Sequence, residues 1–191
     1  MKSNPKGHHR RSIRVGGFDY ASEGGYFVTI CTHDKLCLFG EIIDEAMKLS
    51  DAGEVAKQCW LQLPEHFSRV EVDEFVVMPN HVHGIILLWN DNYLKSQSLK
   101  EKPGRGLMNQ TPTEKWILMK NPKQTLGKII RHYKAKSAKI IHNAGYLEFK
   151  WQRGYYEHII RSENDLNRIR QYIHDNVLKW SYDDENPNRH S

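Results

Sequence analysis

Two histidines separated by one residue are the first feature of this chain that could carry out chemistry. His81 and His83 stand in the stretch Met78-Pro79-Asn80-His81-Val82-His83-Gly84. Side chains at positions i and i+2 of a β-strand point to the same face and lie roughly 7 Å apart. Two neutral imidazoles placed in this way can hold one divalent cation if a third ligand comes from elsewhere in the chain. The alternative is a pair of partly buried polar residues that bind nothing.

A tyrosine and an asparagine near the C-terminus form a second candidate. Tyr172 and Asn176 are four residues apart in an expected helix, which places them about 6 Å apart on the flank of its apolar stripe. One of them can act as a nucleophile while the other binds a metal or orients the same phosphate. The alternative is that the tyrosine packs as an amphipathic residue beside the stripe. The stripe comprises Leu166, Ile169, Ile173, Val177 and Trp180.

Two adjacent tyrosines compete for the role of nucleophile. Tyr155 and Tyr156 lie in an expected strand, where neighbouring side chains point to opposite faces. At most one of them can therefore reach a given site, and we favour Tyr172 over both.

Periodicity in the sequence indicates the elements that must position these residues. Alternating and β-branched patterns predict strands over 25–32, 38–44, 70–78, 81–89 and 154–161, with a turn at Pro79-Asn80 joining two of them as a hairpin. Helical spacing predicts helices from the N-cap Ser50 to Pro64, over 124–143, and from the N-cap Ser162 to about 177.

This order of elements predicts the fold class and the domain organisation. Strands joined by helix-length connections favour an α+β, ferredoxin-like sandwich, in which an antiparallel sheet carries helices on one face and a C-terminal helix bears the tyrosine. We expect a basic N-terminal arm over 1–24 and a single domain over 25–180. That domain contains a loop insertion at about 90–123, and a polar tail follows over 181–191.

Positive charge is clustered along the chain. The net charge is +5, and the segment 115–153 holds ten lysines and arginines but the single acid Glu148. This clustering is typical of proteins that bind a polyphosphate, although a solvated basic face would look the same. The candidate DNA contacts are Arg10, Arg11 and Arg14 in the arm and Lys128, Arg131, Lys134, Lys136 and Lys139 in the helix over 124–143.

Other function classes lack their usual signals. No apolar run approaches the ~18–20 residues of a membrane span, and the basic N-terminus does not resemble a signal peptide. We therefore expect a cytoplasmic protein with no membrane partner. Nothing matches a P-loop or a dinucleotide fingerprint, so no nucleotide cofactor is expected. Cys31, Cys37 and Cys59 show no metal-binding spacing and are interpreted as reduced packing residues.

Four stretches together resemble the REP-associated tyrosine transposases, relatives of the single-tyrosine HUH transposases of the insertion-sequence 200/605 type. They occur in the order found in that family and extend from Arg10 to Asn176. They read RRSIR, YFVTICT, VVMPNHVHGIILL and WQRGYYEHIIRSENDLNRIRQYIHDN. Glu157, His158 and Arg161 belong to the last of these stretches, but no chemical step can be assigned to them.

The resemblance implies an HUH endonuclease fold and transesterification of DNA. It implies that His81 and His83 are metal ligands, that Tyr172 is the nucleophile, and that Asn176 completes the metal site. The expected metal is Mg²⁺ or Mn²⁺, and the expected partner is single-stranded or hairpin DNA bound by a monomer or a homodimer. Cleavage would leave a 5′-phosphotyrosine and a free 3′-hydroxyl.

Two other functions remain open on the sequence alone. One is a catalytically silent, sequence-specific nucleic-acid-binding protein on the same fold. The other is a hydrolytic metal nuclease in which water attacks the phosphate, so that no protein–DNA adduct forms.

Overall fold

The structure is a computed structural model that describes residues 19–90 and 124–189. The basic arm up to residue 18, which includes Arg10, Arg11 and Arg14, and most of the expected insertion lie outside the described residues. The described elements are β1 (Gly24–Cys31), η1 (His33–Lys35), β2 (Gly40–Ile43), β3 (Ala46–Leu49), α1 (Asp51–Leu61), α2 (Leu63–His66), β4 (Val70–Val77), β5 (His81–Leu88), α5 (Leu126–Asn143), β6 (Tyr156–Ile160), α6 (Glu163–Asp175) and η2 (Trp180–Tyr182).

Four strands form one antiparallel sheet in the order β4-β5-β1-β6. Strand β1 pairs with β5 on one side and β6 on the other, and β4 pairs with β5 across a tight turn. Helix α1 lies in the chain between β1 and β4, and α5 lies between β5 and β6. This is the split β-α-β order of a ferredoxin-like sheet, so the predicted α+β fold class is confirmed.

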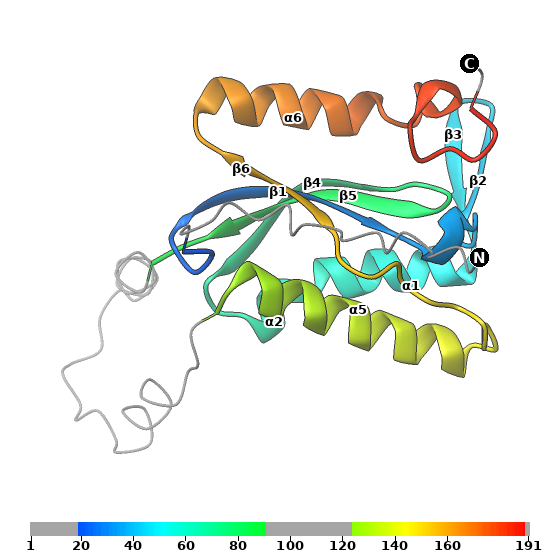
Figure 1. Cartoon of the computed structure of the whole chain (residues 1–191), viewed down its shortest axis with the longest axis horizontal. Helices are drawn as coiled ribbons and strands as arrows, with labels where there is room; N and C mark the ends of the chain where they lie inside the picture. Colours follow the sequence, from blue (N-terminus) through cyan, green and yellow to red (C-terminus); the bar gives the residue numbers. More distant parts are fainter. Residues whose placement is uncertain (1–18, 91–123, 190–191) are drawn as a thin grey trace, which may run out of the picture.

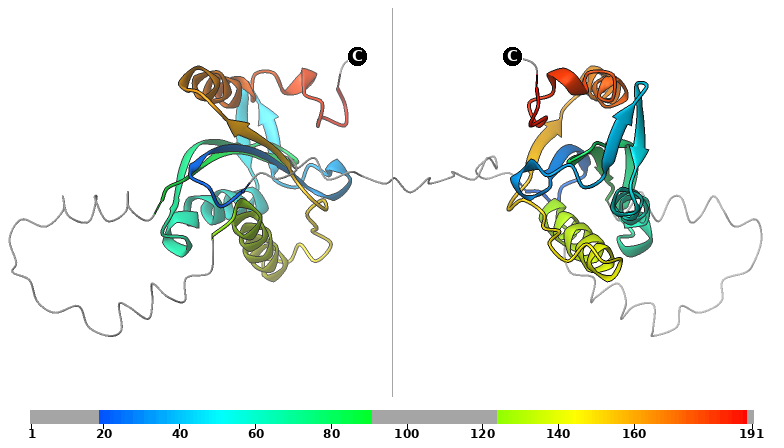
Figure 2. Two further views of the ribbon diagram at one scale, coloured as in Figure 1. Left: turned by 60° about the vertical axis from the view of Figure 1, so that its left-hand side comes forward. Right: turned by 90° about the vertical axis from the view of Figure 1, so that its right-hand side faces the viewer.

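The two faces of the sheet carry different helices. Helices α1 and α5 pack on one face, and α6 crosses the other (Figures 1 and 2). The face under α1 and α5 holds the larger core, whereas α6 is seated on a small apolar cluster. That cluster consists of Phe27, Ile85, Ile169 and Ile173. Because successive strand residues alternate between faces, His81 and His83 lie on the α6 side with Ile85.

Gly84 shows why β5 can lie so close to the larger core. A Cβ atom at this position would lie 2.4 Å from Cζ2 of Trp60, a fully buried side chain of α1. Only glycine allows the strand to approach α1 this closely. Gly84 is therefore required by its packing against Trp60, on the face of the sheet opposite to His81 and His83.

The predicted N-caps Ser50 and Ser162 agree with the structure, whereas the helix expected over 124–143 begins at Leu126 and the helix after Ser50 ends at Leu61. The hydroxyls of Ser50 and Ser162 accept hydrogen bonds from the backbone N–H groups of Gly53 and Asp165, as N-caps do. Helix α6 ends at Asp175, so the expected continuation to residue 177 is wrong, and Trp180 belongs to η2. Among residues 19–90 and 124–189, no helix has both the length and the apolar character needed to cross a membrane.

The strand expected over 38–44 corresponds to β2, which belongs to a two-stranded hairpin and not to the four-stranded sheet. Strand β2 pairs with β3, a strand that the sequence pattern did not predict. The turn between them places Asp44 and Glu45 at φ values of 50° and 59°, as in the tight turns that join two antiparallel strands. The hairpin rises on the α6 side of the sheet, near the C-terminal segment (Figures 1 and 2).

Candidate metal and nucleophile site

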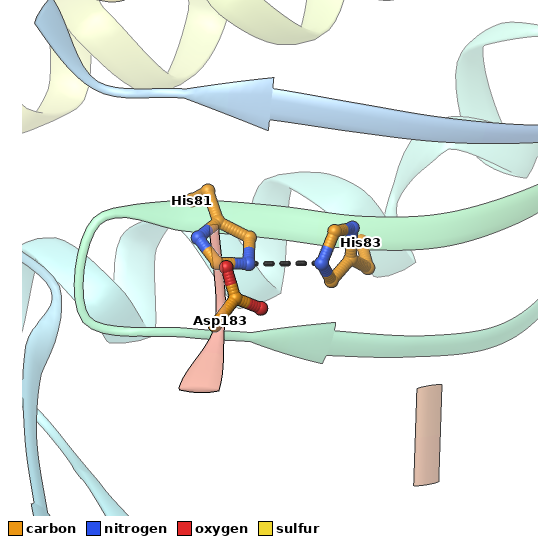
Figure 3. Close-up of side chains that lie close together, drawn as sticks. All are labelled: His81, His83 and Asp183. Carbon is orange, nitrogen blue, oxygen red and sulfur yellow. Dashed lines mark hydrogen bonds between the residues drawn. The ribbon is translucent and has the colours of Figure 1, made fainter. Parts of the chain in front are cut away.

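The two histidines meet at the start of β5, near one end of the sheet. His81 and His83 are 0% and 3% exposed, and their Nε2 atoms lie 2.9 Å apart (Figure 3). Their Nδ1 atoms lie 2.8 Å from Oδ1 of Asn80 and from Oγ1 of Thr29, respectively. The sequence interpretation of one shared strand face therefore agrees with the geometry, and both imidazoles present the same nitrogen to a common point.

Burial keeps both imidazoles neutral. It lowers the pKa of His83 to about 3. It also lowers the pKa of His81 well below its usual value, with smaller contributions from His83 and from the charge of Lys35. A neutral imidazole has a lone pair available for a cation, whereas a protonated one does not. The pair is thus a donor set that suits a divalent metal ion.

Asp183 adds a carboxylate to the pair. Among the described residues, ligand atoms of His81, His83 and Asp183 all lie within 4.8 Å of one another, and Figure 3 shows the carboxylate beside the two rings. Burial raises the pKa of Asp183, as expected for a carboxyl group held away from water. Two nitrogens and one carboxylate oxygen are a common ligand set for a catalytic divalent ion.

Asp183 was not predicted from the sequence, because 181–191 was expected to be a polar tail. In the structure, this segment is tied to the site by backbone carbonyls. The carbonyl of Glu185 accepts from Nδ2 of Asn80 at 2.8 Å, and that of Asp184 accepts from Nζ of Lys35 at 2.7 Å. The only signal in the sequence was an acidic triplet, Asp183-Asp184-Glu185, shortly after the helix that carries Tyr172.

Tyr172 reaches the histidines from α6. Its hydroxyl lies 3.3 Å from Nε2 of His83, and its ring packs edge-on against Phe27 with centroids 5.9 Å apart. Burial raises the pKa of Tyr172, the negative charge of Asp183 raises it further, and a hydrogen bond from Asn176 opposes both effects. The phenol is therefore protonated at neutral pH, and its nucleophilicity depends on nearby positive charge.

Asn176 lies at the C-cap of α6, one turn after Tyr172. It is 2% exposed, and its Oδ1 has no hydrogen-bond partner among the described residues. An unsatisfied buried oxygen costs free energy unless a ligand completes it. Asn176 thus remains a candidate ligand as predicted, although Asp183 is the group whose distance to both histidines is established.

A pocket of about 1040 Å³ opens beside this cluster. Its walls come from β1, β5, β6, α6 and the C-terminal segment, so the pocket lies on the α6 side of the sheet. The lining includes His83, Asn176 and Asp183, three exposed tyrosines and several charged side chains. His81 is not part of the lining but contacts His83, which is. The other residues that line it, besides Tyr172, are Phe27, Thr29, Tyr156, His158, Arg168, Ile169, Lys179, Tyr182, Asp184 and Glu185.

The competing tyrosines separate as their alternation predicts. Tyr156 faces the pocket and is 47% exposed, whereas Tyr155 packs against the larger core on the opposite face. Two polar residues near these tyrosines, His158 and Arg161, are also placed by the structure. His158 lines the pocket and pairs with Asp165 of α6 at 2.8 Å, and Arg161 is exposed just after β6.

The basic residues of α5 are not brought to this pocket. Helix α5 covers the other face of the sheet (Figure 1). Nζ of Lys134 donates to the carbonyls of Gln152 and Gly154, and burial lowers its pKa to about 8. Nζ of Lys136 donates to Oε1 of Gln62 at 2.8 Å. These two lysines therefore serve internal contacts, and the solvent-exposed members of the predicted set are Lys128, Arg131 and Lys139.

The fold defines the class of protein: an α+β chain with a transposase-like fold. The solved structure of a REP-associated tyrosine transposase bound to a REP hairpin matches 87% of this chain and 73% of that chain. The match has a TM-score of 0.53 and 17% sequence identity.

Sequence comparison then gives the family. An uncharacterized protein of Haemophilus influenzae strain Rd is 41% identical over 182 residues, which cover 95% of this chain and 96% of the relative. The chain belongs to the same family as that protein. No protein-family model matches the chain.

Proposed function

We propose that this protein is a metal-dependent DNA strand transferase of the transposase type. It cleaves and rejoins single-stranded or hairpin DNA, with Tyr172 as the nucleophile. The observation that carries the proposal is the hydroxyl of Tyr172, which lies 3.3 Å from Nε2 of His83, a neutral buried histidine of the candidate metal site. The transposase whose fold it shares is bound to a REP hairpin, which supports DNA as the substrate class.

The residues present fit a divalent metal ion. His81 and His83 offer two lone pairs, Asp183 offers a carboxylate, and Asn176 has a buried oxygen without a partner among the described residues. The metal supplies charge that stabilises the pentacoordinate transition state of a phosphodiester. Imidazole ligands favour Mn²⁺ over Mg²⁺, and the site accepts either in this proposal.

The proposed step exchanges one phosphodiester bond for another. The phenolic oxygen of Tyr172 loses its proton and forms a bond to the phosphorus atom. The bond from phosphorus to the 3′-oxygen breaks, and that oxygen takes up a proton as a free 3′-hydroxyl. The phosphate remains on Tyr172 as a 5′-phosphotyrosine, so a second 3′-hydroxyl can reverse the step without ATP.

Features of the pocket support an unpaired strand as the substrate. Tyr156 and Tyr182 are 47% and 74% exposed and offer aromatic faces on which bases can stack. Arg168 and Lys179 line the same pocket and can contact phosphates. A strand that must enter a walled pocket beside Tyr172 needs a flexible backbone, which duplex DNA lacks. One chain supplies every one of these groups.

One observation favours a second candidate, a catalytically silent nucleic-acid-binding protein. Asp183, Asp184 and Glu185 all line the pocket that must accept a negatively charged phosphodiester. Unless a cation neutralises Asp183, these charges repel the scissile phosphate. The two candidates make different predictions for the fate of bound DNA.

The test is incubation with hairpin DNA that carries labelled single-stranded flanks, with Mn²⁺ or with EDTA. We expect a denaturation-resistant protein–DNA adduct in Mn²⁺ only, with the label 3′ of the cut retained on the protein. Cleavage without an adduct would identify water as the attacking group and a hydrolytic nuclease. Binding without cleavage over a panel of hairpins would identify the silent protein. His81→Ala and His83→Ala should each abolish the adduct.

A further inference from the structure

Each histidine of the cluster makes a second hydrogen bond through its Nδ1 atom, besides the contact between the two Nε2 atoms. An imidazole can offer a lone pair to a cation at Nε2 only if its proton is carried on Nδ1. The groups next to Nδ1 therefore decide which nitrogen is free. These groups are Asn80 for His81 and Thr29 for His83, each at 2.8 Å.

The orientation of the Asn80 amide is determined by its other contacts. Nδ2 donates to the carbonyl oxygens of Lys35 and Glu185, at 3.0 and 2.8 Å. Both partners are acceptors only, so the NH₂ group must face them and Oδ1 must face His81. Oδ1 can only accept, and His81 must therefore carry its proton on Nδ1. Asn80 in this way leaves the lone pair of His81 at Nε2, where a cation would bind.

Thr29 differs from Asn80 because a hydroxyl can donate or accept. The Nε2 atoms of the two histidines are 2.9 Å apart, so without a cation one must donate to the other. His81 has its proton on Nδ1, which makes His83 the donor from Nε2 and makes its Nδ1 an acceptor from Thr29. With a cation, both Nε2 atoms need lone pairs, and His83 must instead donate from Nδ1 to Thr29. Rotation of one hydroxyl accommodates both arrangements.

We propose that Asn80 and Thr29 are positioning residues for the metal ion: Asn80 holds His81 in its metal-binding tautomer, and Thr29 allows His83 to change tautomer when metal enters. Asn80 is fully buried, and Thr29 is 8% exposed and lines the pocket, so each histidine has a direct partner within the protein at Nδ1. The inference rests on the metal site of the proposed function and concerns how that site is prepared. Outer partners of this kind typically change metal affinity by about 10–100-fold when removed.

The first test compares Mn²⁺ affinity by titration calorimetry across threonine variants of the full chain. Thr29→Val keeps the shape of the side chain and its preference for a strand but removes the hydroxyl, and we expect binding weaker by about 10–100-fold. Thr29→Ser restores the hydroxyl and should return to within about 3-fold of the wild type. Thr32→Val is the matched control. Its buried hydroxyl donates to the carbonyl of Leu36, and the Nδ1 partners of the two histidines are other residues, so the Mn²⁺ affinity of this variant should match the wild type.

The second test needs no variant and reads the histidine tautomers directly by ¹⁵N NMR. In the wild type with EDTA, we expect His81 protonated on Nδ1 and His83 on Nε2. With the diamagnetic ion Zn²⁺, both should be protonated on Nδ1. Equal Mn²⁺ affinity of Thr29→Val and the wild type, or a His83 tautomer that Zn²⁺ leaves unchanged, would overturn the role of Thr29.

The two tests separate this inference from the proposed function. If the wild type binds neither Mn²⁺ nor Zn²⁺, the metal site itself is wrong, whatever the tautomers are. If the wild type binds metal but His81 is found protonated on Nε2 in EDTA, the metal site stands and the role given to Asn80 is wrong.

Discussion

At the scale of single residues, burial shifts the pKa values of the site in directions that a cation would exploit. It lowers the pKa values of His81 and His83, which keeps their lone pairs available. It raises the pKa values of Asp183 and Tyr172, which favours their protonated forms. A bound divalent ion would lower the pKa values of Asp183 and Tyr172 again, because its charge stabilises a carboxylate and a phenolate. The metal would therefore activate Tyr172 and relieve the repulsion from Asp183 together.

The contribution of Asp183 can be measured by removing its charge alone. We expect Asp183→Asn to weaken Mn²⁺ binding on the order of tenfold or more, because removing a ligand should cost no less than removing an outer partner. Asp184→Asn is the control, since its side chain is 87% exposed and lies next in the chain. Titration calorimetry distinguishes the two variants. Equal affinities for both would remove Asp183 from the metal site.

These residues also show what sequence could and could not predict. Local spacing and family resemblance were enough to select His81, His83, Tyr172 and Asn176 as candidates. In the structure the last three line one pocket, and His81 contacts His83. Asp183 follows a helix end and approaches β5 only because the C-terminal segment folds back over Asn80, about a hundred residues away in the chain. No periodicity records such a contact. The hydrogen bonds of Lys134 and Lys136 could not be predicted either, because their partners are also distant in the sequence.

At the scale of elements, α6 carries the proposed nucleophile and is held on the sheet by a small apolar cluster together with polar contacts. Its apolar seat consists of Phe27, Ile85, Ile169 and Ile173. Beside this seat, the guanidinium of Arg170 donates to both carboxylate oxygens of Asp73, which lies at the bulge in β4. A bidentate pair of this kind fixes direction as well as distance. Arg170 lies two residues before Tyr172, so this ion pair joins α6 to β4 close to the proposed nucleophile.

Removing the Asp73 carboxylate should loosen α6 in a pH-dependent manner. The hydrogen bonds from Arg170 lower the pKa of Asp73 below its usual 3.8, so the ionised carboxylate favours the folded state. That stabilisation is complete above the usual pKa and is lost as pH falls through the lowered one. We expect Asp73→Asn to lower the free energy of unfolding by about 1 kcal/mol at pH 7.

Urea unfolding at pH 7 and at about pH 3 measures this effect, and the difference between wild type and Asp73→Asn should shrink at the lower pH. Glu54→Gln provides the control, because its partner Lys57 lies 4.0 Å away on the surface of α1. It should change stability by less than about 0.5 kcal/mol. A constant difference between wild type and Asp73→Asn at both pH values would show that the pair does not act through its charge.

At the scale of the whole molecule, the sheet separates two surfaces that the sequence could not place. Tyr172 and the histidines lie on one side, and the exposed Lys128, Arg131 and Lys139 belong to α5 on the other. The fold class was predictable from the order of the elements, but the side on which each helix packs was not. DNA that touches both surfaces must pass around an edge of the sheet, and a short strand in the pocket cannot reach α5.

This separation predicts how DNA length affects binding. Replacing Lys128, Arg131 and Lys139 with glutamine should weaken binding of a hairpin with a long stem. The slope of log affinity against log salt should become shallower by roughly 0.7–0.9 for each phosphate that is no longer neutralised. Binding of a short single strand that only fills the pocket should not change. Fluorescence anisotropy over a range of salt concentrations measures both, and an unchanged slope for the hairpin would mean that α5 does not face DNA.

The central claim, that Tyr172 is the nucleophile, is tested most directly by intact mass spectrometry of the protein after reaction with hairpin DNA and Mn²⁺. Tyr172→Phe removes one oxygen and keeps the ring that packs against Phe27, so the variant should fold and bind DNA as the wild type does. Tyr156→Phe is the matched control in the same pocket. We predict a covalent DNA adduct on the wild type and on Tyr156→Phe, and none on Tyr172→Phe. An adduct that persists in Tyr172→Phe would contradict the claim.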